Sequence, residues 1–185
     1  DDLTTAQWKS AFHKLTSAKL FRVTLTGGEV FTRTDIFRLI DFITAGRMRY
    51  SILTNGTLVD ERVVEELKRE NRLKRLDSIQ VSIDGSSPEI HNRSRPDSFH
   101  RAIRGLRLLQ REGFPVTARV TIGKNNVEDL DGITELLLEE IGLASYTTCD
   151  ASPIGAGCSC EAELSLDQRD ILRAGLSLEI LVRKY

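Results

Sequence analysis

The sequence predicts an α/β fold built on a parallel sheet, and three observations carry that prediction. Short runs rich in β-branched residues recur along the chain, each run is preceded by a helical pattern, and each ends in polar or glycine-rich residues. The runs begin roughly 30 residues apart, which is the length of one βα unit in a parallel barrel or a doubly wound sheet. The predicted strands are Phe21–Leu25, Arg49–Thr54, Ser78–Ile83, Val116–Ile122 and Tyr146–Asp150.

The composition is that of one ordinary globular domain. The chain has 185 residues, enough to bury a substantial core, and its 26 basic and 27 acidic residues nearly cancel. A net charge of -1 gives no reason to propose nucleic acid or an anionic membrane as a partner. No apolar run approaches the roughly 20 residues of a membrane helix. The three cysteines do not indicate a disulfide framework, so a cytoplasmic location is expected.

The helices are predicted by their caps and by apolar spacing. The chain opens on a helix near Thr4 or Thr5, so we expect the first strand of the sheet to lie upstream of the sequence. Ser98 precedes a segment whose apolar residues share one helical face, and Gly113 ends that helix. The remaining predicted helices begin near Asp60, Asn126 and Ser165.

Each predicted strand ends in residues suited to binding. In parallel α/β folds, ligands bind at the carboxyl ends of the strands, so we expect these residues to converge on one rim. The segments are Thr26–Glu29, Thr54–Thr57, Gln80–Gly85, Arg119–Asn125 and Asp150–Gly157.

The chemistry of these segments suits a small ligand of mixed charge. Gly27 and Gly28 lack Cβ atoms, so a ligand can approach the main chain there, and Glu29 offers a carboxylate to an ammonium group. Arg119 suits a carboxylate, and the turn at Gly155 suits the edge of a base. Residues suited to hydroxyl groups are Thr54, Asn55, Ser82 and Asp84. An amino acid joined to a nucleoside matches this set.

Several of these segments resemble a known family. Thr26–Glu29 is similar to the Gly-Gly-Glu motif of the radical S-adenosylmethionine (radical SAM) superfamily, which binds the amino group of the methionine moiety. Val81–Gly85, followed by Pro88–Arg95, resembles the branch that contains SPASM-type maturases and the molybdenum cofactor biosynthesis protein A. The segment Pro153–Gly155 resembles the adenine-contacting turn after the sixth strand. The resemblance covers essentially the whole chain.

The resemblance implies a partial parallel (β/α)6 barrel of the TIM-like radical SAM type, with residues 1–185 forming strands two to six. It implies an enzyme that uses SAM and a 4Fe-4S cluster, cleaves SAM reductively and abstracts a hydrogen atom from a peptide or small-molecule substrate, in peptide or cofactor maturation. Residues implied to bind SAM are Gly27, Gly28, Glu29, Thr54, Asn55, Ser82, Asp84, Arg119, Asn125, Pro153 and Gly155.

The sequence departs from the family pattern at the metal site. The Cys-x3-Cys-x2-Cys loop is absent, and Cys149, Cys158 and Cys160 have neither its spacing nor its place. Val30 stands where a proline often follows the glutamate. We therefore expect no metal ligand in this chain and cluster ligands upstream of it, and we expect the isolated chain to be unable to cleave SAM.

Alternatives remain at this stage. The chain could belong to an α/β barrel enzyme that acts on a phosphorylated metabolite, or to a non-catalytic barrel scaffold. Single residues also have structural interpretations. Asn55 and Gly56 could form a turn, Asp84 could cap the next helix, and Arg119 could be an ion-pair partner inside the barrel.

Overall fold

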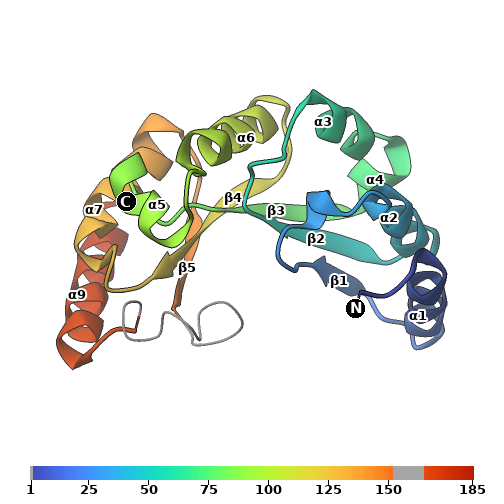
Figure 1. The fold of residues 1–185 in the computed structure, drawn as a ribbon, viewed down its shortest axis with the longest axis horizontal. Coiled ribbons are helices and arrows are strands. Elements are labelled where there is room, and N and C mark those ends of the chain that lie inside the picture. Colours follow the sequence, from blue (N-terminus) through green and yellow to red (C-terminus); the bar gives the residue numbers. More distant parts are fainter. Residues whose placement is uncertain (1, 152–164) are drawn as a thin grey trace. The chain divides into compact units, whose positions relative to one another are not determined.

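The computed structural model describes residues 2–151 and 165–185 and has the predicted α/β architecture (Figure 1). Five strands form a parallel sheet in the order β1-β2-β3-β4-β5. The strands are β1 (Arg22–Leu25), β2 (Arg49–Thr54), β3 (Leu76–Ser82), β4 (Val116–Ile122) and β5 (Tyr146–Asp150). The predicted parallel sheet is confirmed, with small shifts at the ends of β1 and β3.

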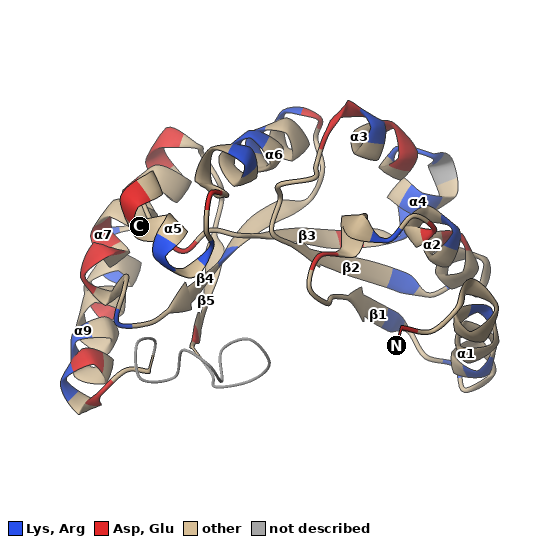
Figure 2. Cartoon of the chain, in the orientation of Figure 1, with Lys and Arg blue, Asp and Glu red and all other residues tan. Residues whose placement is uncertain are grey.

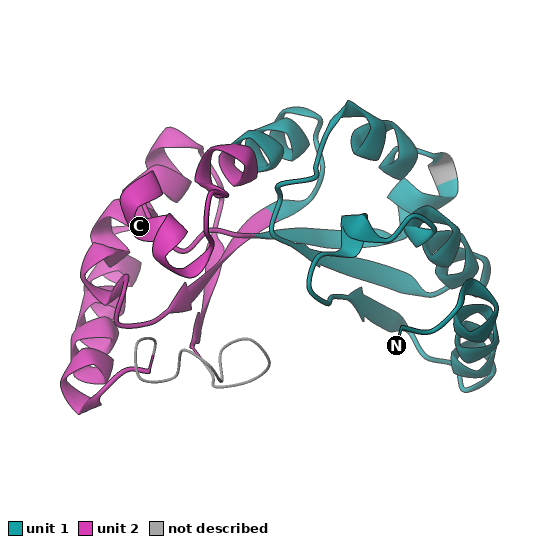
Figure 3. Ribbon diagram, viewed as in Figure 1, with its two compact units in different colours: residues 1–81, 104–116 teal, residues 82–103, 117–185 magenta. Residues whose placement is uncertain are grey.

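The chain divides into two compact units, coloured separately in Figure 3. Unit 1 comprises residues 1–81 and 104–116, and unit 2 comprises residues 82–103 and 117–185. The helix α6 (Phe99–Arg111) has residues in both units.

Unit 1 contains β1, β2, most of β3 and several helices. They are α1 (Thr5–Ser17), the 3-10 turn η1 (Val30–Thr32), α2 (Ile36–Ala45), α3 (Glu61–Leu67) and α4 (Glu70–Arg75). Helix α1 begins with a capping box, in which Gln7 donates its amide to Thr4 Oγ1 and accepts the Thr4 amide on its side chain. Asp60 caps α3 as predicted, because its carboxylate accepts the Val63 amide at 2.9 Å.

The core of unit 1 lies between β2 and the helices. Ile40 and Ile43 of α2, Ile52 of β2 and Leu67 of α3 are completely buried. Each buried aliphatic side chain contributes about 1.5–3 kcal/mol of hydrophobic stabilisation. This packing fixes β2, and therefore the position of the residues that follow it.

Unit 2 contains β5 and a second set of helices. They are α5 (Pro88–Ser94), the 3-10 turn η2 (Val127–Asp129), α7 (Leu130–Thr134), the π-helical η3 (Glu135–Glu140) and α9 (Gln168–Lys184). Asp167 caps α9 by accepting the amides of Arg169 and Asp170 at 2.8 and 2.9 Å. The last helix thus begins slightly after the expected Ser165.

The segment after Asn126 differs from the single helix that its apolar spacing predicts. It comprises a 3-10 turn, an α-helix and a π-helix in succession, and the Ile141 amide bonds the Leu136 carbonyl in the wider π pattern at 2.9 Å. Leu136 and Leu137 are both buried. Over so few residues, apolar spacing does not distinguish turns of different width.

The arginines of α6 lie on its exposed side. Arg101, Arg104 and Arg107 are exposed, whereas Ala102 and Leu106 are completely buried, and the basic residues of this helix are blue in Figure 2. This alternation is that of a solvated helix face. Within the described residues, no helix is long and apolar enough to cross a membrane.

Candidate cofactor-binding site

The Glu29 carboxylate joins the loop after β1 to the loop after β2. Its Oε1 accepts the Phe31 amide at 3.1 Å and the Thr54 hydroxyl at 2.7 Å, and its Oε2 accepts the Asn55 amide at 2.7 Å. Thr54 is only 3% exposed. The carboxylate that the sequence assigns to a ligand is therefore bonded to both loops of the protein itself.

The loop after β2 is a tight turn. Asn55 Oδ1 accepts the amide and the hydroxyl of Thr57 at 2.9 and 2.7 Å. Gly56 donates its amide to Thr54 Oγ1 at 3.0 Å and has a φ of 76°, a left-handed conformation that favours glycine. The alternative interpretation of Asn55 and Gly56 as a turn is confirmed.

Gly27 and Gly28 present open main chain beside a cavity. Both glycines are exposed, and a Cβ atom added to either would meet nothing within 4 Å. The adjoining cavity has a volume of about 330 Å³ and is bounded by β1, its following loop and apolar side chains that include Trp8, Phe12 and Leu39. Packing does not require glycine at these two positions, and their bare main chain is available to a ligand.

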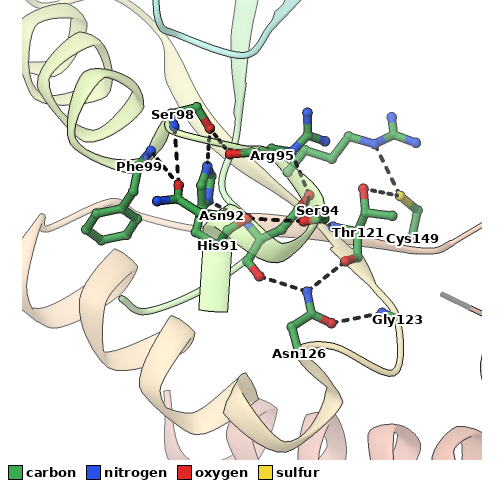
Figure 4. Close-up of polar contacts among 12 residues, drawn as sticks. His91, Asn92, Ser94, Arg95, Ser98, Phe99, Thr121, Gly123, Asn126 and Cys149 are labelled. Carbon is green, nitrogen blue, oxygen red and sulfur yellow. Dashed lines mark hydrogen bonds and ion pairs between the residues drawn. The ribbon is translucent and has the colours of Figure 1, made fainter. Parts of the chain in front are cut away.

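Asp84 is the centre of a buried polar network in unit 2, and Figure 4 shows the surrounding residues Ser94, Arg95, Thr121 and Asn126. It is 2% exposed. Its Oδ1 accepts the Thr121 amide at 2.8 Å, and its Oδ2 accepts Arg95 Nε at 2.6 Å and, more weakly, the Ser94 hydroxyl at 3.4 Å. Ser87 occupies the N-cap of α5, so the alternative interpretation in which Asp84 caps that helix is not met.

His91 supports this network as a neutral imidazole. Burial lowers the pKa of His91 to about 4, the nearby Asp84 charge opposes this and the Arg95 charge adds to it. Nδ1 accepts the Asp84 amide at 3.1 Å, so Nε2 carries the proton and donates to Ser98 Oγ at 3.0 Å. The Ser98 hydroxyl in turn donates to the Arg95 carbonyl at 2.6 Å. Both ring nitrogens are thus used within the chain, which identifies a packing role for His91.

Arg119 differs from Asp84 in having few bonds within the chain. Its Nε donates to Cys149 Sγ at 3.3 Å, and Thr121 Oγ1 lies 3.7 Å from the same sulfur (Figure 4). Among the residues that the structure describes, Arg119 forms no ion pair, so the ion-pair alternative is not met. The outer nitrogens of its guanidinium have no acceptor within the described part of the chain and are open to another one.

The other expected binding residues lie apart from these contacts. Ser82 ends β3 and is half-buried. Asn125 lines a cavity of about 260 Å³ with Arg93 and Lys124, and its carbonyl accepts Arg93 Nη1 at 3.2 Å. Pro153 and Gly155 lie outside the described residues.

Two residues of the unit 2 network were missed in the sequence. Arg95 forms the ion pair with Asp84 through the loop after β3 and helix α5, which lie between the two residues. Asn126, predicted as a helix start, donates its side-chain amide to the carbonyls of Asp84 and Thr121 at 2.9 and 2.8 Å, and accepts the Gly123 amide at 2.8 Å. The sequence signal available for Asn126 was the pair of neighbouring asparagines, Asn125 and Asn126, after β4. A buried asparagine needs hydrogen-bond partners for both its side-chain oxygen and its side-chain nitrogen, so such a pair indicates a polar network.

The described residues do not fit an iron–sulfur cluster. They contain no group of three or more His, Cys, Asp or Glu side chains placed to hold a metal ion, and Cys149 is the free cysteine among them. Cys158 and Cys160 lie outside the described part. A 4Fe-4S cluster is normally held by several cysteine thiolates.

The comparisons with known proteins identify the class. Residues 1–137 match the Radical SAM superfamily, and the chain belongs to that family. It is thus part of a family of enzymes that use SAM and a 4Fe-4S cluster. Membership of the radical SAM superfamily rules out the alternative of an α/β barrel enzyme that acts on a phosphorylated metabolite.

The similar curated proteins include a heme synthase and a maturase. The chain is 31% identical over 173 residues to an AdoMet-dependent heme synthase of Methanosarcina barkeri, covering 92% of this chain and 48% of that protein. It is 30% identical over 137 residues to the mycofactocin maturase MftC of Mycolicibacterium smegmatis, covering 73% and 34%. The chain therefore spans about half or less of the length of these relatives.

A solved structure confirms the fold. SuiB of Streptococcus suis, in its complex with S-adenosylmethionine, superposes with a TM-score of 0.74 at 16% identity, covering 100% of this chain and 40% of that chain. At this identity the match concerns the fold alone.

Proposed function

We propose that this chain is the SAM-binding part of an enzyme that cleaves SAM reductively and abstracts a hydrogen atom from its substrate, in peptide or cofactor maturation. The observation that carries the proposal is the open main chain of Gly27 and Gly28 at the end of β1, beside a cavity of about 330 Å³. Membership of the radical SAM superfamily supports it, as does the SAM complex of SuiB.

The residue roles in this proposal follow the chemistry of SAM. The segment Gly27–Glu29 receives the methionine amino group, and Arg119 is available for the carboxylate because its outer guanidinium nitrogens have no acidic partner among the described residues. Ser82 and Asn55 serve the ribose. Thr54 and Asp84 take part through the bonds that hold their loops, because their polar side-chain atoms are occupied. Pro153 and Gly155 border the adenine in this proposal.

The cluster supplies reductive cleavage in the family, and this chain's described residues do not fit it. The share proposed for this chain is therefore the binding and orientation of SAM. A protein that orients a cofactor in this way contributes binding geometry and exclusion of water.

The substrate class is proposed as a peptide or a small organic cofactor precursor. The supporting names are those of a maturase and a heme synthase among the relatives, and SuiB, which was solved with its precursor peptide SuiA. A cytoplasmic location stays a prediction from the cysteine content.

Titration of SAM into the full-length protein tests the proposal. The wild type should bind SAM, and Gly28→Val should weaken binding by at least about tenfold, because its side chain would occupy the open main-chain face. Gly175→Val, in the exposed part of α9, is the matched control and should leave SAM affinity unchanged. Equal affinities for the wild type and Gly28→Val would contradict the proposed site.

A further inference from the structure

We propose that the cavity beside the carboxyl end of β4 binds a carboxylate group of the enzyme's substrate, through Arg93, Lys124 and the side-chain amide of Asn125. The inference rests on the proposed function in one respect, which is that a peptide or small organic substrate reaches this end of the sheet. It assigns Asn125 to the substrate, whereas the sequence places that residue among the groups that bind SAM.

The cavity lies between helix α5 and the loop after β4, within unit 2. Ile90 and Arg93 line it from α5, and its other lining residues come from the segment 124–129. In parallel α/β folds, ligands bind at the carboxyl ends of the strands, so the position is that of a binding site. The volume of about 260 Å³ is below the roughly 300–1,000 Å³ of a complete small-molecule site, and it suits one group of a larger ligand.

Hydrogen bonds hold both walls of the cavity in place. Asp129 accepts the amide and the hydroxyl of Ser86, each at 2.7 Å, which joins η2 to the segment before α5. Arg93 Nη1 donates to the Asn125 carbonyl at 3.2 Å. Asn126 is 2% exposed and bonds three main-chain groups around the same loop. Because the protein itself fixes this loop, binding has little ordering cost.

The two cations of the cavity have no acidic partner in the described part of the chain. Arg93 makes the carbonyl bond to Asn125 and no ion pair, and Lys124 makes no ion pair. Nearby carboxylates are engaged elsewhere, since Glu128 pairs with Arg173 and Asp129 is bonded to the segment before α5. The charge that remains at the cavity favours an anion.

One more carboxylate lies near Lys124. Asp167 caps α9, where main-chain amides lower its pKa and the charge of Lys124 adds to this effect. Its Oδ1 accepts the amides of Arg169 and Asp170 at 2.8 and 2.9 Å. Asp167 is therefore held at the start of α9 and does not form an ion pair with Lys124.

Asn125 has a buried polar atom that lacks a partner. Its side-chain nitrogen is shielded from water, and no acceptor for it lies within the described residues. A buried donor without an acceptor is unfavourable, and most such groups in proteins are bonded. A carboxylate in the cavity supplies this acceptor after a small rotation of the amide. The same carboxylate accepts parallel bonds from a guanidinium and a further bond from an ammonium group.

Protection of Lys124 from acylation tests the proposal in the full-length protein. The probe is succinate, its neutral diamide succinamide is the control, and mass spectrometry reads the acylation of each lysine. Succinate at about 50 mM should slow the acylation of Lys124 about threefold or more, because a bound carboxylate blocks the amine. Lys14, exposed in α1, should react at an unchanged rate. Equal rates for Lys124 with and without succinate, or equal protection by succinamide, would overturn the proposal.

Arg93→Gln and Arg101→Gln form a matched pair of variants. Both arginines are exposed in unit 2 and donate to a main-chain carbonyl, at 3.2 and 3.1 Å. Arg93→Gln should remove most of the protection, because the parallel bonds of the guanidinium are lost, and Arg101→Gln should retain it. Protection that survives in Arg93→Gln would mean an adventitious ion only. If Arg93→Gln does not fold, full protection in Asn125→Ala contradicts the site.

Two further probes identify the anion and separate the site from that of SAM. Protection by inorganic phosphate without protection by succinate would contradict the carboxylate assignment. SAM carries a carboxylate of its own and should leave the acylation of Lys124 unchanged. Protection by SAM would join the cavity to the cofactor site and overturn the inference. A failure of SAM to bind in the titration contradicts the proposed function alone, because the succinate measurement does not depend on SAM.

Discussion

Units 1 and 2 each place a carboxylate just after a strand, and the two carboxylates are held in different ways. Glu29 in unit 1 is half-buried and accepts two main-chain amides and one hydroxyl. Asp84 in unit 2 is 2% exposed and is paired with the Arg95 cation. Both side chains bind a neighbouring loop, but unit 1 leaves open main chain beside its carboxylate. A polar residue at a strand end can therefore hold a neighbouring loop in place as well as contact a ligand.

Removal of the Asp84 carboxylate should have the largest effect on stability. Asp84→Ala leaves the Arg95 guanidinium and the Thr121 amide without their acceptor in a partly buried site, which costs about 3 kcal/mol of unfolding free energy. Urea unfolding of the full-length protein measures this loss. Asp131→Ala, which removes an exposed carboxylate of the same unit, should cost well below about 1 kcal/mol. Equal midpoints for the two variants would show that the network contributes no stability.

Acid should weaken unit 2 through His91. Its folded pKa of about 4 lies below the usual value of 6.5, so the unfolded chain takes up the proton first as the pH falls. The contribution of neutral His91 to the free energy of unfolding is fully present above pH 6.5. As the pH falls from 6.5 to about 4, up to about 3 kcal/mol of it is lost.

Unfolding free energies measured across that range test the acid effect. His91→Gln should show a shallower pH dependence than the wild type, whereas His13→Gln, at an exposed position of α1, should retain the wild-type slope. An unchanged slope in His91→Gln would assign the acid sensitivity to other groups.

The hydrogen bonds of Glu29 in unit 1 should be weaker than the Asp84 network. Glu29→Ala removes the acceptor of half-buried donors, and water can replace part of it, so we expect a loss of about 1–2 kcal/mol. Thermal unfolding of this variant beside Asp84→Ala ranks the two carboxylates directly. A larger loss for Glu29→Ala would reverse the comparison between the units.

Arg119 should contribute least to stability. Arg119→Gln removes a bond to the Cys149 sulfur and no ion pair with a described residue, so the expected change is below about 0.5 kcal/mol. Arg95→Gln, which breaks the pair with Asp84, should cost about 2 kcal/mol or more. Similar losses for both variants would mean that Arg119 is a structural residue and is not held available for a ligand.

The sequence by itself determined the class of fold and the order of its elements. β-branched runs, caps such as Asp60 and the spacing of about 30 residues are local or periodic signals, because strands and helices impose fixed repeats on buried side chains. The Gly-Gly-Glu segment was likewise found from residues adjacent in the chain.

The tertiary structure alone decided what the polar residues at the strand ends bind. Glu29 meets the loop after β2, and Asp84 meets the Thr121 amide, through contacts between segments far apart in the chain. No repeat relates such positions, because a hydrogen bond across neighbouring strands depends on strand order and register. The same dependence hid Asn126, and it explains why residue type suggested ligand contacts where Thr54 and Asp84 bond to the protein itself. Arg95 was hidden for another reason, because it reaches Asp84 through the path of the loop and helix between them.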